Sequence, residues 1–360
     1  MKKRKICVYA ICKNEEKFAL RWINSMKEAD KIFVLDTGST DNSVNILKEN
    51  GAIVKNLEIN PWRFDVARNK SLEMVPLDAD ICVCTDLDEV FEKGWREKLE
   101  SIWSDNTNRC RYIYNWSFEK DKPSVSFYYE KIHSRNGYKW VNPVHEILAT
   151  SESENVVTSD EIVLNHYPDP TKSRASYLEL LELSVKEDSE NDRNMHYLGR
   201  EYMFRGKYKE AIETLKKHLN LKSATWKDER CASMRFIARC YKFLEDYDNA
   251  KKYLDMAILE SPYLRDPYVE KALLLYDLED YEGVEKYCLK ALQITKYEKT
   301  YINETFSWDN TIYDLLSISC YNLEKYDYAL YFVDIALSYD NTNERLINNR
   351  EIFKRLVNNN

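Results

Sequence analysis

The chain has 360 residues, which is enough for two domains with a sizeable hydrophobic core. Its apolar fraction of 44% and charged fraction of 32% are typical of globular proteins and exclude wholesale disorder. A net charge of −8, without a long basic run, argues against nucleic acid as the main partner. Only 7 glycines beside 27 tyrosines argue against an all-β sandwich with many tight turns.

The compartment is predicted from apolar runs and cysteines. No stretch approaches the roughly 20 apolar residues of a membrane span. The apolar run over residues 6–11 is too short for a signal peptide, and Lys13 follows it at once. The nine cysteines are odd in number and mostly lie in apolar runs, so we expect reduced, buried thiols without zinc. These features predict a cytoplasmic protein without a transmembrane segment.

The first half alternates short apolar runs with helical patterns. After the first run, Phe18, Trp22, Ile23 and Met26 recur at helical spacing. Buried strands separated by helices predict βαβ units and a mostly parallel, Rossmann-like sheet, which binds ligands at the carboxyl ends of its strands. The predicted strands cover residues 6–11, 32–35, 53–57 and 81–85, and further helices follow around residues 44–50 and 66–74.

From about Thr171 the pattern is helical only, and a six-residue phrase recurs four times. The phrases begin at Gly206, Glu245, Glu279 and Glu324, at intervals of 39, 34 and 45 residues. A period near 34 with small residues at the helix crossings resembles tetratricopeptide repeats, in about four degenerate units, with a generic helical bundle as the alternative. The predicted organisation is a catalytic domain over residues 1–170, a connecting helix over 171–190 and repeats over 191–360.

A pair of carboxylates follows the fourth predicted strand. In the segment Asp86-Leu87-Asp88-Glu89, residues two apart on an extended chain face the same side, so Asp86 and Asp88 are expected to converge. Paired oxygen ligands at a strand end suit Mg²⁺ or Mn²⁺ bound to a diphosphate. The alternative is that these acids only cap a helix over residues 90–99.

Further motifs place this site in a known context. Asn14-Glu15-Glu16 follows the first strand, residues 36–41 read Asp-Thr-Gly-Ser-Thr-Asp after the second, and Ala67-Arg68-Asn69 precedes the fourth. With the Asp86–Glu89 segment, these motifs resemble family 2 glycosyltransferases of the GT-A type over roughly residues 5–170. The resemblance implies an α/β GT-A fold, a nucleotide-sugar donor and a divalent metal, Mn²⁺ or Mg²⁺.

The resemblance also implies roles for single residues. Asp36 would contact the base, Asp86 the ribose or a metal-bound water, and Asp88 the metal directly. Thr37 stands where many members carry a second acid. Arg68 would approach the diphosphate, with a salt bridge on a helix surface as the alternative. Asp65, just before the Ala-Arg-Asn segment, is placed with the nucleotide-sugar residues, whereas Asp41 is expected to act as a helix N-cap.

Two later segments resemble repeat-bearing members of the family. Residues 140–146 read Trp-Val-Asn-Pro-Val-His-Glu, with Asn142 or Pro143 at the position of the usual glycine. Glu146 is the predicted catalytic base, expected to lie away from the diphosphate carboxylates, with Asp65 and Glu89 in reserve; alternatively, it only orients His145 or a backbone amide. His166 precedes the helical half and is a candidate metal ligand or else a structural histidine.

These observations predict an inverting, metal-dependent hexosyltransferase. The donor would be a nucleotide-sugar, a UDP-sugar by resemblance, and the acceptor a peptide, protein or cell-surface glycan. The plan resembles the peptide S- or O-glycosyltransferases of bacteriocin clusters. The repeats would bind the acceptor or form a homodimer. The alternatives are a non-catalytic repeat adaptor with a degenerate transferase domain, a sugar nucleotidylyltransferase, which should carry a glycine-rich loop after the first strand, and a phosphatase with an Asp-x-Asp motif on its first strand.

Overall fold

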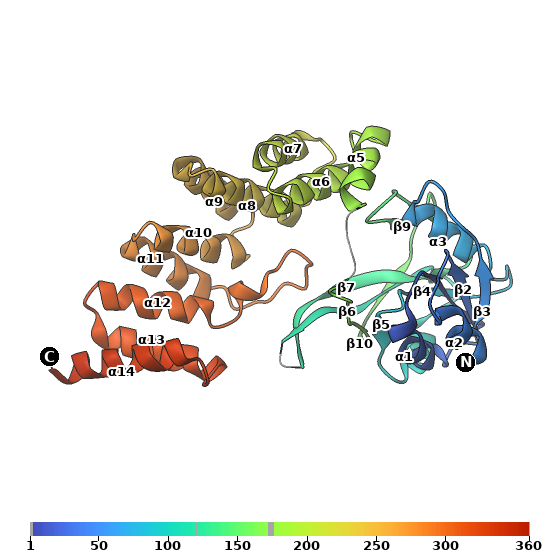
Figure 1. Cartoon of the computed structure of the whole chain (residues 1–360), viewed down its shortest axis with the longest axis horizontal. Coiled ribbons are helices and arrows are strands. Elements are labelled where there is room, and N and C mark those ends of the chain that lie inside the picture. The colour runs from blue at the N-terminus through green and yellow to red at the C-terminus, as the bar shows by residue number, and fades with distance from the viewer. Residues whose placement is uncertain (1–2, 120, 172–175, 360) are drawn as a thin grey trace. The chain divides into compact units, whose positions relative to one another are not determined.

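The chain forms two compact units, each described by itself (Figure 1). In this computed structural model, residues 3–119, 121–171 and 176–359 are described. The first unit contains residues up to Ser184 together with residues 299–301, and the second contains residues 185–298 and 302–360. The division falls inside helix α5 (Tyr177–Glu187), in the region where the connecting helix is predicted. Residues 172–175 of that predicted segment lie outside the described residues.

The first unit is built on a mixed sheet whose order is β3-β2-β1-β4-β7-β6-β10-β5. Its first four strands are parallel, as the alternation of apolar runs predicts. They are β1 (Ile6–Cys12), β2 (Lys31–Asp36), β3 (Ile53–Asn56) and β4 (Ile81–Cys84). The strand order reverses direction between β1 and β4, which is the position where open α/β sheets bind ligands. The predicted α/β architecture is thereby confirmed.

Both faces of the parallel strands are buried, which explains why their sequences are continuous apolar runs. Along β1, Ile6 and Val8 pack into one core cluster, whereas Cys7 and Tyr9 pack into a second cluster. The first cluster includes residues of α1 (Glu16–Met26), α2 (Ser43–Glu49) and α4 (Trp95–Ile102), and the second includes Leu72 at the end of α3 (Phe64–Leu72).

The remaining strands extend the sheet beyond β4 with both antiparallel and parallel pairs. β7 runs antiparallel to β4 and to β6, β6 and β10 are parallel, and β5 runs antiparallel to β10 at the edge. These strands are β5 (Glu89–Phe91), β6 (Arg109–Glu119), β7 (Lys122–Ser134) and β10 (Val156–His166), and a separate hairpin contains β8 (Lys139–Val141) and β9 (Ile147–Ala149). Their polar strand sequences do not show the apolar runs from which the first four strands are predicted.

The second unit is a series of helix pairs, as the repeats predict. The four pairs join α6 (Asp192–Phe204) to α7 (Tyr208–Asn220), α8 (Lys227–Phe243) to α9 (Tyr247–Glu260), α10 (Asp266–Asp277) to α11 (Tyr281–Leu292), and α12 (Thr311–Asn322) to α13 (Tyr326–Tyr339). A 3₁₀ turn (Thr305–Ser307) precedes α12, and α14 (Glu344–Asn359) follows the last pair.

The recurring phrase marks the turn inside each helix pair. Its first residue has a positive φ in all four copies: 72° at Gly206 and 59°, 56° and 59° at Glu245, Glu279 and Glu324. The next residue donates its backbone N–H to a carbonyl five residues earlier at 2.8–2.9 Å, which is the hydrogen bond of a Schellman cap. The phrase therefore recurs because the chain needs the same left-handed cap between the helices of each pair.

The cysteine and membrane predictions can be compared with the structure. All nine cysteines are buried and unpaired, so the prediction of buried free thiols is confirmed. Burial raises the pKa of the Cys84 thiol to about 11, which makes it a poor nucleophile. No helix among the described residues is both long and apolar enough to cross a membrane.

Candidate functional site

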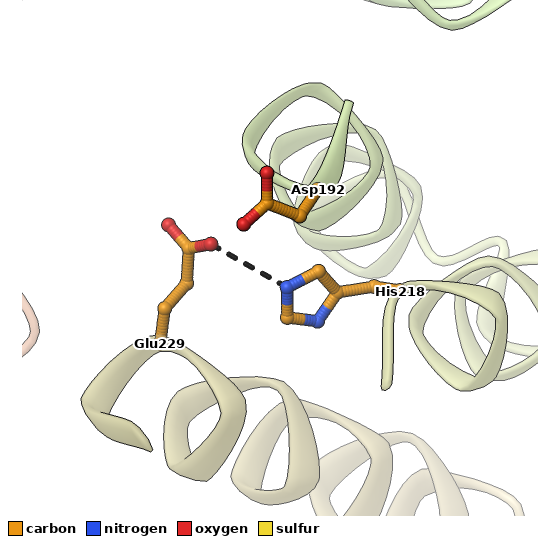
Figure 2. A group of neighbouring side chains, drawn as sticks. All are labelled: Asp192, His218 and Glu229. Carbon is orange, nitrogen blue, oxygen red and sulfur yellow. Dashed lines mark ion pairs between the residues drawn. The ribbon is translucent and has the colours of Figure 1, made fainter. Parts of the chain in front are cut away.

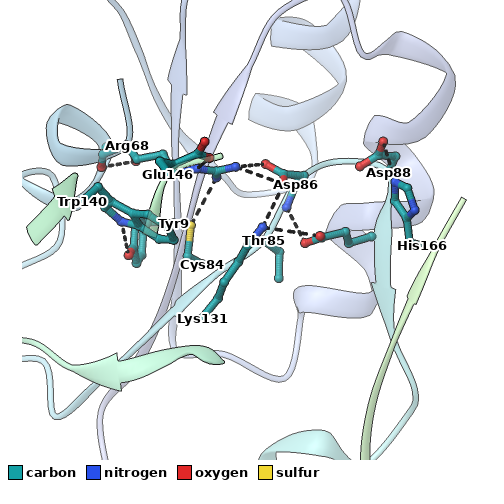
Figure 3. A network of polar contacts seen from close by, with 12 residues as sticks. Tyr9, Arg68, Cys84, Thr85, Asp86, Asp88, Lys131, Trp140, Glu146 and His166 are labelled. Atoms are coloured by element: carbon teal, nitrogen blue, oxygen red, sulfur yellow. Dashed lines mark hydrogen bonds and ion pairs between the residues drawn. The ribbon is translucent and has the colours of Figure 1, made fainter. Parts of the chain in front are cut away.

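The acidic segment after β4 forms a turn and not an extended chain. β4 ends at Cys84, and the backbone N–H of Glu89 donates to the Asp86 carbonyl at 3.1 Å. The expectation that Asp86 and Asp88 converge is therefore wrong, because alternation of faces holds only for extended backbone. Figure 3 shows the Asp86 carboxylate turned toward Arg68 and Lys131, and that of Asp88 toward His166. The alternative of a helix over residues 90–99 is also wrong, because strand β5 intervenes and α4 begins at Trp95.

Two cationic side chains hold Asp86. Arg68 Nη2 donates to Asp86 Oδ1 at 2.8 Å, and Lys131 Nζ donates to Asp86 Oδ2 at 3.0 Å. Burial would raise the pKa of Asp86, but the charges of Arg68 and then Lys131 outweigh it and hold that pKa well below its usual range. Asp86 is thus ionised, and Arg68 and Lys131 already balance its negative charge. A carboxylate in this state is better suited to accept a hydrogen bond from a sugar hydroxyl than to bind a metal directly.

Lys131 belongs to this candidate site and was not predicted from the sequence. It lies on β7, which pairs antiparallel with β4, and its side chain is only 6% exposed. Burial alone would lower the pKa of Lys131, but Asp86 and Glu89 raise it well above its usual value. In the sequence, Lys131 stands in a segment that mixes polar and apolar residues and continues with Ile132 and His133. This pattern does not indicate that the segment pairs with β4.

Glu89 is a structural carboxylate at this site. It is 2% exposed, accepts hydrogen bonds at 2.8 Å from the Tyr114 hydroxyl and from the Asp86 backbone N–H, and lies 3.5 Å from Lys131 Nζ. Burial raises the pKa of its carboxyl group. Because the backbone, a tyrosine and a lysine enclose it, Glu89 is badly placed to receive an acceptor's proton, and the geometry argues against its use as the reserve base.

Asp88 and His166 form a second pair of polar side chains in the site, next to the Asp86 network. Asp88 Oδ2 lies 3.5 Å from His166 Nε2, because β5 and β10 pair with His166 opposite Glu89. His166 Nδ1 donates to the Trp116 carbonyl at 3.0 Å, and the two rings stack with centroids 4.5 Å apart. Burial would lower the pKa of His166, but Asp88 raises it.

A divalent cation would fit between Asp88 and His166. The hydrogen bond from His166 Nδ1 to a carbonyl leaves Nε2 as the atom that faces the Asp88 carboxylate, an arrangement that is common for metal-binding histidines. Asp86 does not complete a preformed trio with these two residues. In the described part of the chain, the trio of ligand-type side chains with donor atoms within 4.8 Å of one another lies elsewhere, in the helical unit.

Glu146 belongs to the same network as Asp86. Its Oε1 forms a short ion pair with Arg68 Nε, and Arg68 in turn holds Asp86. The expectation that Glu146 lies away from the donor-side carboxylates is therefore wrong, and its role as the base stays a prediction. Arg68 is 4% exposed and lies over the Trp140 ring, 5.1 Å from its centroid, so the alternative of a helix-surface salt bridge is also wrong.

The turn that carries Glu146 keeps the shape of a glycine-containing turn. Asn142 has a φ of 78°, so this asparagine adopts the left-handed conformation at the position where the usual glycine is missing. The Trp140 indole before it donates to the Tyr9 hydroxyl at 2.9 Å, and that hydroxyl is 2.8 Å from His133 Nε2. Burial lowers the pKa of His133 to about 3, so it is a neutral structural residue.

The loop over residues 36–41 is folded around its two acids. Asp36 is 1% exposed and accepts from the backbone N–H groups of Gly38 and Ser39 at 3.2 and 3.1 Å. Asp41 accepts from the backbone N–H groups of Ser43 and Glu16, at the starts of α2 and α1. The N-cap residue of α2 is Asn42 and not the expected Asp41, but the Asp41 carboxylate still accepts from N–H groups at the starts of two helices. Asp36 shapes the loop in which a base contact is predicted.

Asp65 is bound locally. It is 7% exposed, pairs with Arg63 at 2.9 Å and accepts from the backbone N–H of Val66 in the first turn of α3. Both of these partners lie at the start of α3. Its predicted roles, as a donor-binding residue or reserve base, stay predictions, and its contacts are those of a residue that fixes the start of α3.

Comparisons with known families agree with this geometry. Residues 7–147 match the family model for glycosyl transferase family 2, and residues 193–225 and 236–262 match the model for a tetratricopeptide repeat. The first match covers the carboxyl ends of β1, β2 and β4, and it also includes Lys131 and Glu146.

Individual relatives of this chain are named glycosyltransferases. The chain is 26% identical over 290 residues to the SPbeta prophage-derived glycosyltransferase SunS of Bacillus subtilis, covering 74% of this chain and 66% of that protein. It is 33% identical over 111 residues to an uncharacterized glycosyltransferase of Rickettsia typhi, covering 31% and 36%. It thus spans just under two thirds of the first relative and about a third of the second. Among solved structures, YrrB, a TPR protein, aligns at 15% identity with a TM-score of 0.41, covering 51% of this chain and 86% of that one.

Proposed function

We propose that this chain, which carries a glycosyl transferase family 2 domain followed by tetratricopeptide repeats, transfers a sugar from a nucleotide-sugar to a peptide, protein or cell-surface glycan. The observation that carries the proposal is the polar site beside the switch point between β1 and β4. There, Asp86 between two cations and Asp88 beside His166 lie in one turn after β4. The family match and the glycosyltransferase relatives support the same reaction.

The two acids of the turn have different tasks in this proposal. Asp86, fixed by Arg68 and Lys131, accepts a hydrogen bond from a hydroxyl of the donor's ribose or sugar. Asp88 and His166 hold Mn²⁺ or Mg²⁺, which would neutralise negative charge on the diphosphate. Because hard oxygen ligands and one imidazole suit Mn²⁺ somewhat better than Mg²⁺, Mn²⁺ is the first cation to test.

Inversion needs a base that removes the acceptor's proton on the face of the sugar opposite the diphosphate. Glu146 remains the proposed base, and its ion pair with Arg68 supplies a reason for its fixed position. Arg68 links it to Asp86, so that a carboxylate for the acceptor and a carboxylate for the donor are held by one guanidinium. The donor nucleotide proposed here is UDP, and the repeats are proposed to bind the acceptor or to form a homodimer.

Substitution of Asp88 tests the proposal directly. Asp88→Asn should abolish Mn²⁺-dependent stabilisation by UDP-sugar, because it removes a charged ligand oxygen while the fold stays intact. Thermal unfolding with UDP-, GDP- and dTDP-sugars, each with and without Mn²⁺, is the measurement. Glu97→Gln, an exposed acid on α4, is the matched control and should behave as the parent does. Chelator-sensitive donor binding that survives in Asp88→Asn would contradict the assignment.

A further inference from the structure

Three helix ends of the repeat unit bring metal-ligand side chains together (Figure 2). Asp192 is the first residue of α6, His218 lies in the last turn of α7, and Glu229 lies in the first turn of α8. One ligand atom from each lies within 4.8 Å of the others. Among residues 3–119, 121–171 and 176–359, this is the group of three that meets that distance.

The imidazole of His218 points an unsatisfied nitrogen into this group. His218 is 0% exposed, and within the described part of the chain its Nε2 makes no hydrogen bond. Glu229 Oε1 lies 3.4 Å from that nitrogen, and the Glu229 residue is only 4% exposed. A buried polar nitrogen without a hydrogen bond is unfavourable, so a bound cation at this nitrogen would be stabilising.

The other nitrogen of His218 is held by a second polar layer. Ser233 Oγ lies 2.9 Å from His218 Nδ1 and 2.7 Å from His196 Nδ1. Ser233 Oγ can donate its proton to His196 Nδ1, which leaves the serine oxygen able to accept a hydrogen bond. Ser233 can then accept from the Nδ1–H of His218, which is the tautomer that leaves Nε2 with a free electron pair. Such a partner on the opposite nitrogen is typical of metal-binding histidines.

From this arrangement, we propose that Asp192, His218 and Glu229 form a second divalent metal site, separate from that of the transferase domain and selective for a transition ion of the Zn²⁺ type. One imidazole nitrogen and two carboxylate oxygens are ligands that Zn²⁺ accepts, and water completes its tetrahedron on the side of the partly exposed Asp192. Mg²⁺ prefers an all-oxygen octahedron and is expected to bind weakly.

The position of the site indicates a structural task. His218 and Glu229 flank the connection between α7 and α8, which lies in the first and longer-than-usual interval of the repeat. Asp192 adds the start of α6, so a bound ion would tie three helices of the first two pairs together. Because a metal that binds only the folded state stabilises that state by mass action, a bound ion should raise the stability of this part of the repeat unit.

Zinc binding to the full chain tests the proposal without any activity assay. The chain, stripped with EDTA, is titrated with Zn²⁺ alone, and bound metal and the midpoint of thermal unfolding are measured. The parent background is Asp88→Asn, so that a metal site in the transferase domain does not contribute. We expect one Zn²⁺ per chain and a rise in the midpoint with Zn²⁺, and no comparable rise with Mg²⁺ at the same concentration.

Substitutions in the cluster then identify its ligands. Asp192→Asn and Glu229→Gln should each weaken Zn²⁺ binding at least tenfold, and Ser233→Ala, a change of a positioning residue, about tenfold. Asp248→Asn is the control, because Asp248 is an exposed aspartate in the first turn of another repeat helix, α9, and does not belong to the cluster. His218→Gln should abolish binding; if that variant fails to fold, the two carboxylate variants decide.

Two results would overturn the proposal. The first is a stripped Asp88→Asn chain that takes up no Zn²⁺ and shows no rise in its unfolding midpoint, because His218 and Glu229 would then contact each other without a metal. The second is undiminished Zn²⁺ affinity in both Asp192→Asn and Glu229→Gln, which would place the bound zinc elsewhere.

Discussion

Lys131 shows how much a single buried charge determines at this site. It is the cation shared by Asp86 and Glu89, while Arg68 is the cation shared by Asp86 and Glu146. The result is a chain of alternating charges through the centre of the site (Figure 3). Removal of one buried member should therefore be costly, since its neighbours keep their charges without a partner.

We expect Lys131→Met to lower the free energy of unfolding by about 3 kcal/mol, because Glu89 would stay buried without its cation. The value is at the low end for buried pairs because the Asp86 side chain is 32% exposed and keeps Arg68. Urea unfolding measures the change. The double variant Lys131→Met/Glu89→Gln should recover part of the loss, and a purely additive double variant would contradict the coupling between the two residues.

Glu146→Gln separates the two roles that the geometry allows. If Glu146 is the base, donor affinity stays within a few-fold while the transfer rate falls about 10²-fold or more. If Glu146 mainly positions Arg68, donor affinity falls together with the rate, because Arg68 also holds Asp86. Donor affinity and turnover are to be measured on one preparation. Unchanged turnover would assign the base to another residue.

At the scale of elements, the repeat unit uses one cap four times with two kinds of residue. Gly206 adopts a left-handed conformation at little cost, whereas Glu245, Glu279 and Glu324 adopt it with a side chain attached. No atom lies within 4 Å of a Cβ built on Gly206, so the cost of a side chain at this position comes from the left-handed backbone and not from a lack of space.

Exchange of these residues should change stability in opposite directions. Glu279→Gly should raise the free energy of unfolding by about 0.5–1 kcal/mol, and Gly206→Ala should lower it by a similar amount. Urea unfolding of the full chain, followed by its helical signal, measures both. Glu213→Gly, in the middle of α7 with an exposed side chain, is the control and should cost about 1 kcal/mol. A stability loss in Glu279→Gly would contradict the role of this cap.

Strand pairing within the sheet is the other feature at this scale that decides the site. The antiparallel pairing of β5 with β10 places His166 opposite Glu89, and the pairing of β7 with β4 places Lys131 close to Asp86. Strands β7 and β10 come from parts of the chain far from the acidic turn. The site is therefore assembled by sheet topology, with Asp86 and Asp88 on one turn and its cations and imidazole on three other elements.

At the scale of the whole molecule, the two units have separate cores. The large cluster of the first unit contains residues of β1, β4, α1 and α4, and the clusters of the second unit contain residues of the helix pairs. Because each unit buries its own apolar side chains, each has what it needs for independent folding.

A chain ending at Glu187 should therefore fold cooperatively and still gain stability from donor and Mn²⁺, yet lose transfer to the physiological acceptor. The reason is that the donor-side residues named above all precede residue 187, whereas the repeats are the proposed acceptor surface. Thermal unfolding with donor checks the first part, and turnover with the acceptor checks the second. Full transfer by the shortened chain would show that the repeats do not bind the acceptor.

The sequence by itself determined the parallel part of the sheet, the helical repeats and the position of the acidic turn. Apolar runs report burial on both faces, helical spacing reports one buried face, and a recurring cap phrase reports a repeated turn; each is a local property that can be read without knowledge of distant partners. The placement of Asp36, Asp86 and Asp88 after buried strands follows from the same patterns.

Only the tertiary structure decided what these acids contact. Asp86 and Asp88 were expected to face the same way, but the turn directs one to Arg68 and Lys131 and the other to His166. Glu146 joins the donor side because its hairpin lies against α3, and the cluster at Asp192 arises from three helix ends that are 26 and 11 residues apart in the chain. Such contacts depend on strand pairing and helix packing between segments distant in sequence, and no local pattern encodes them.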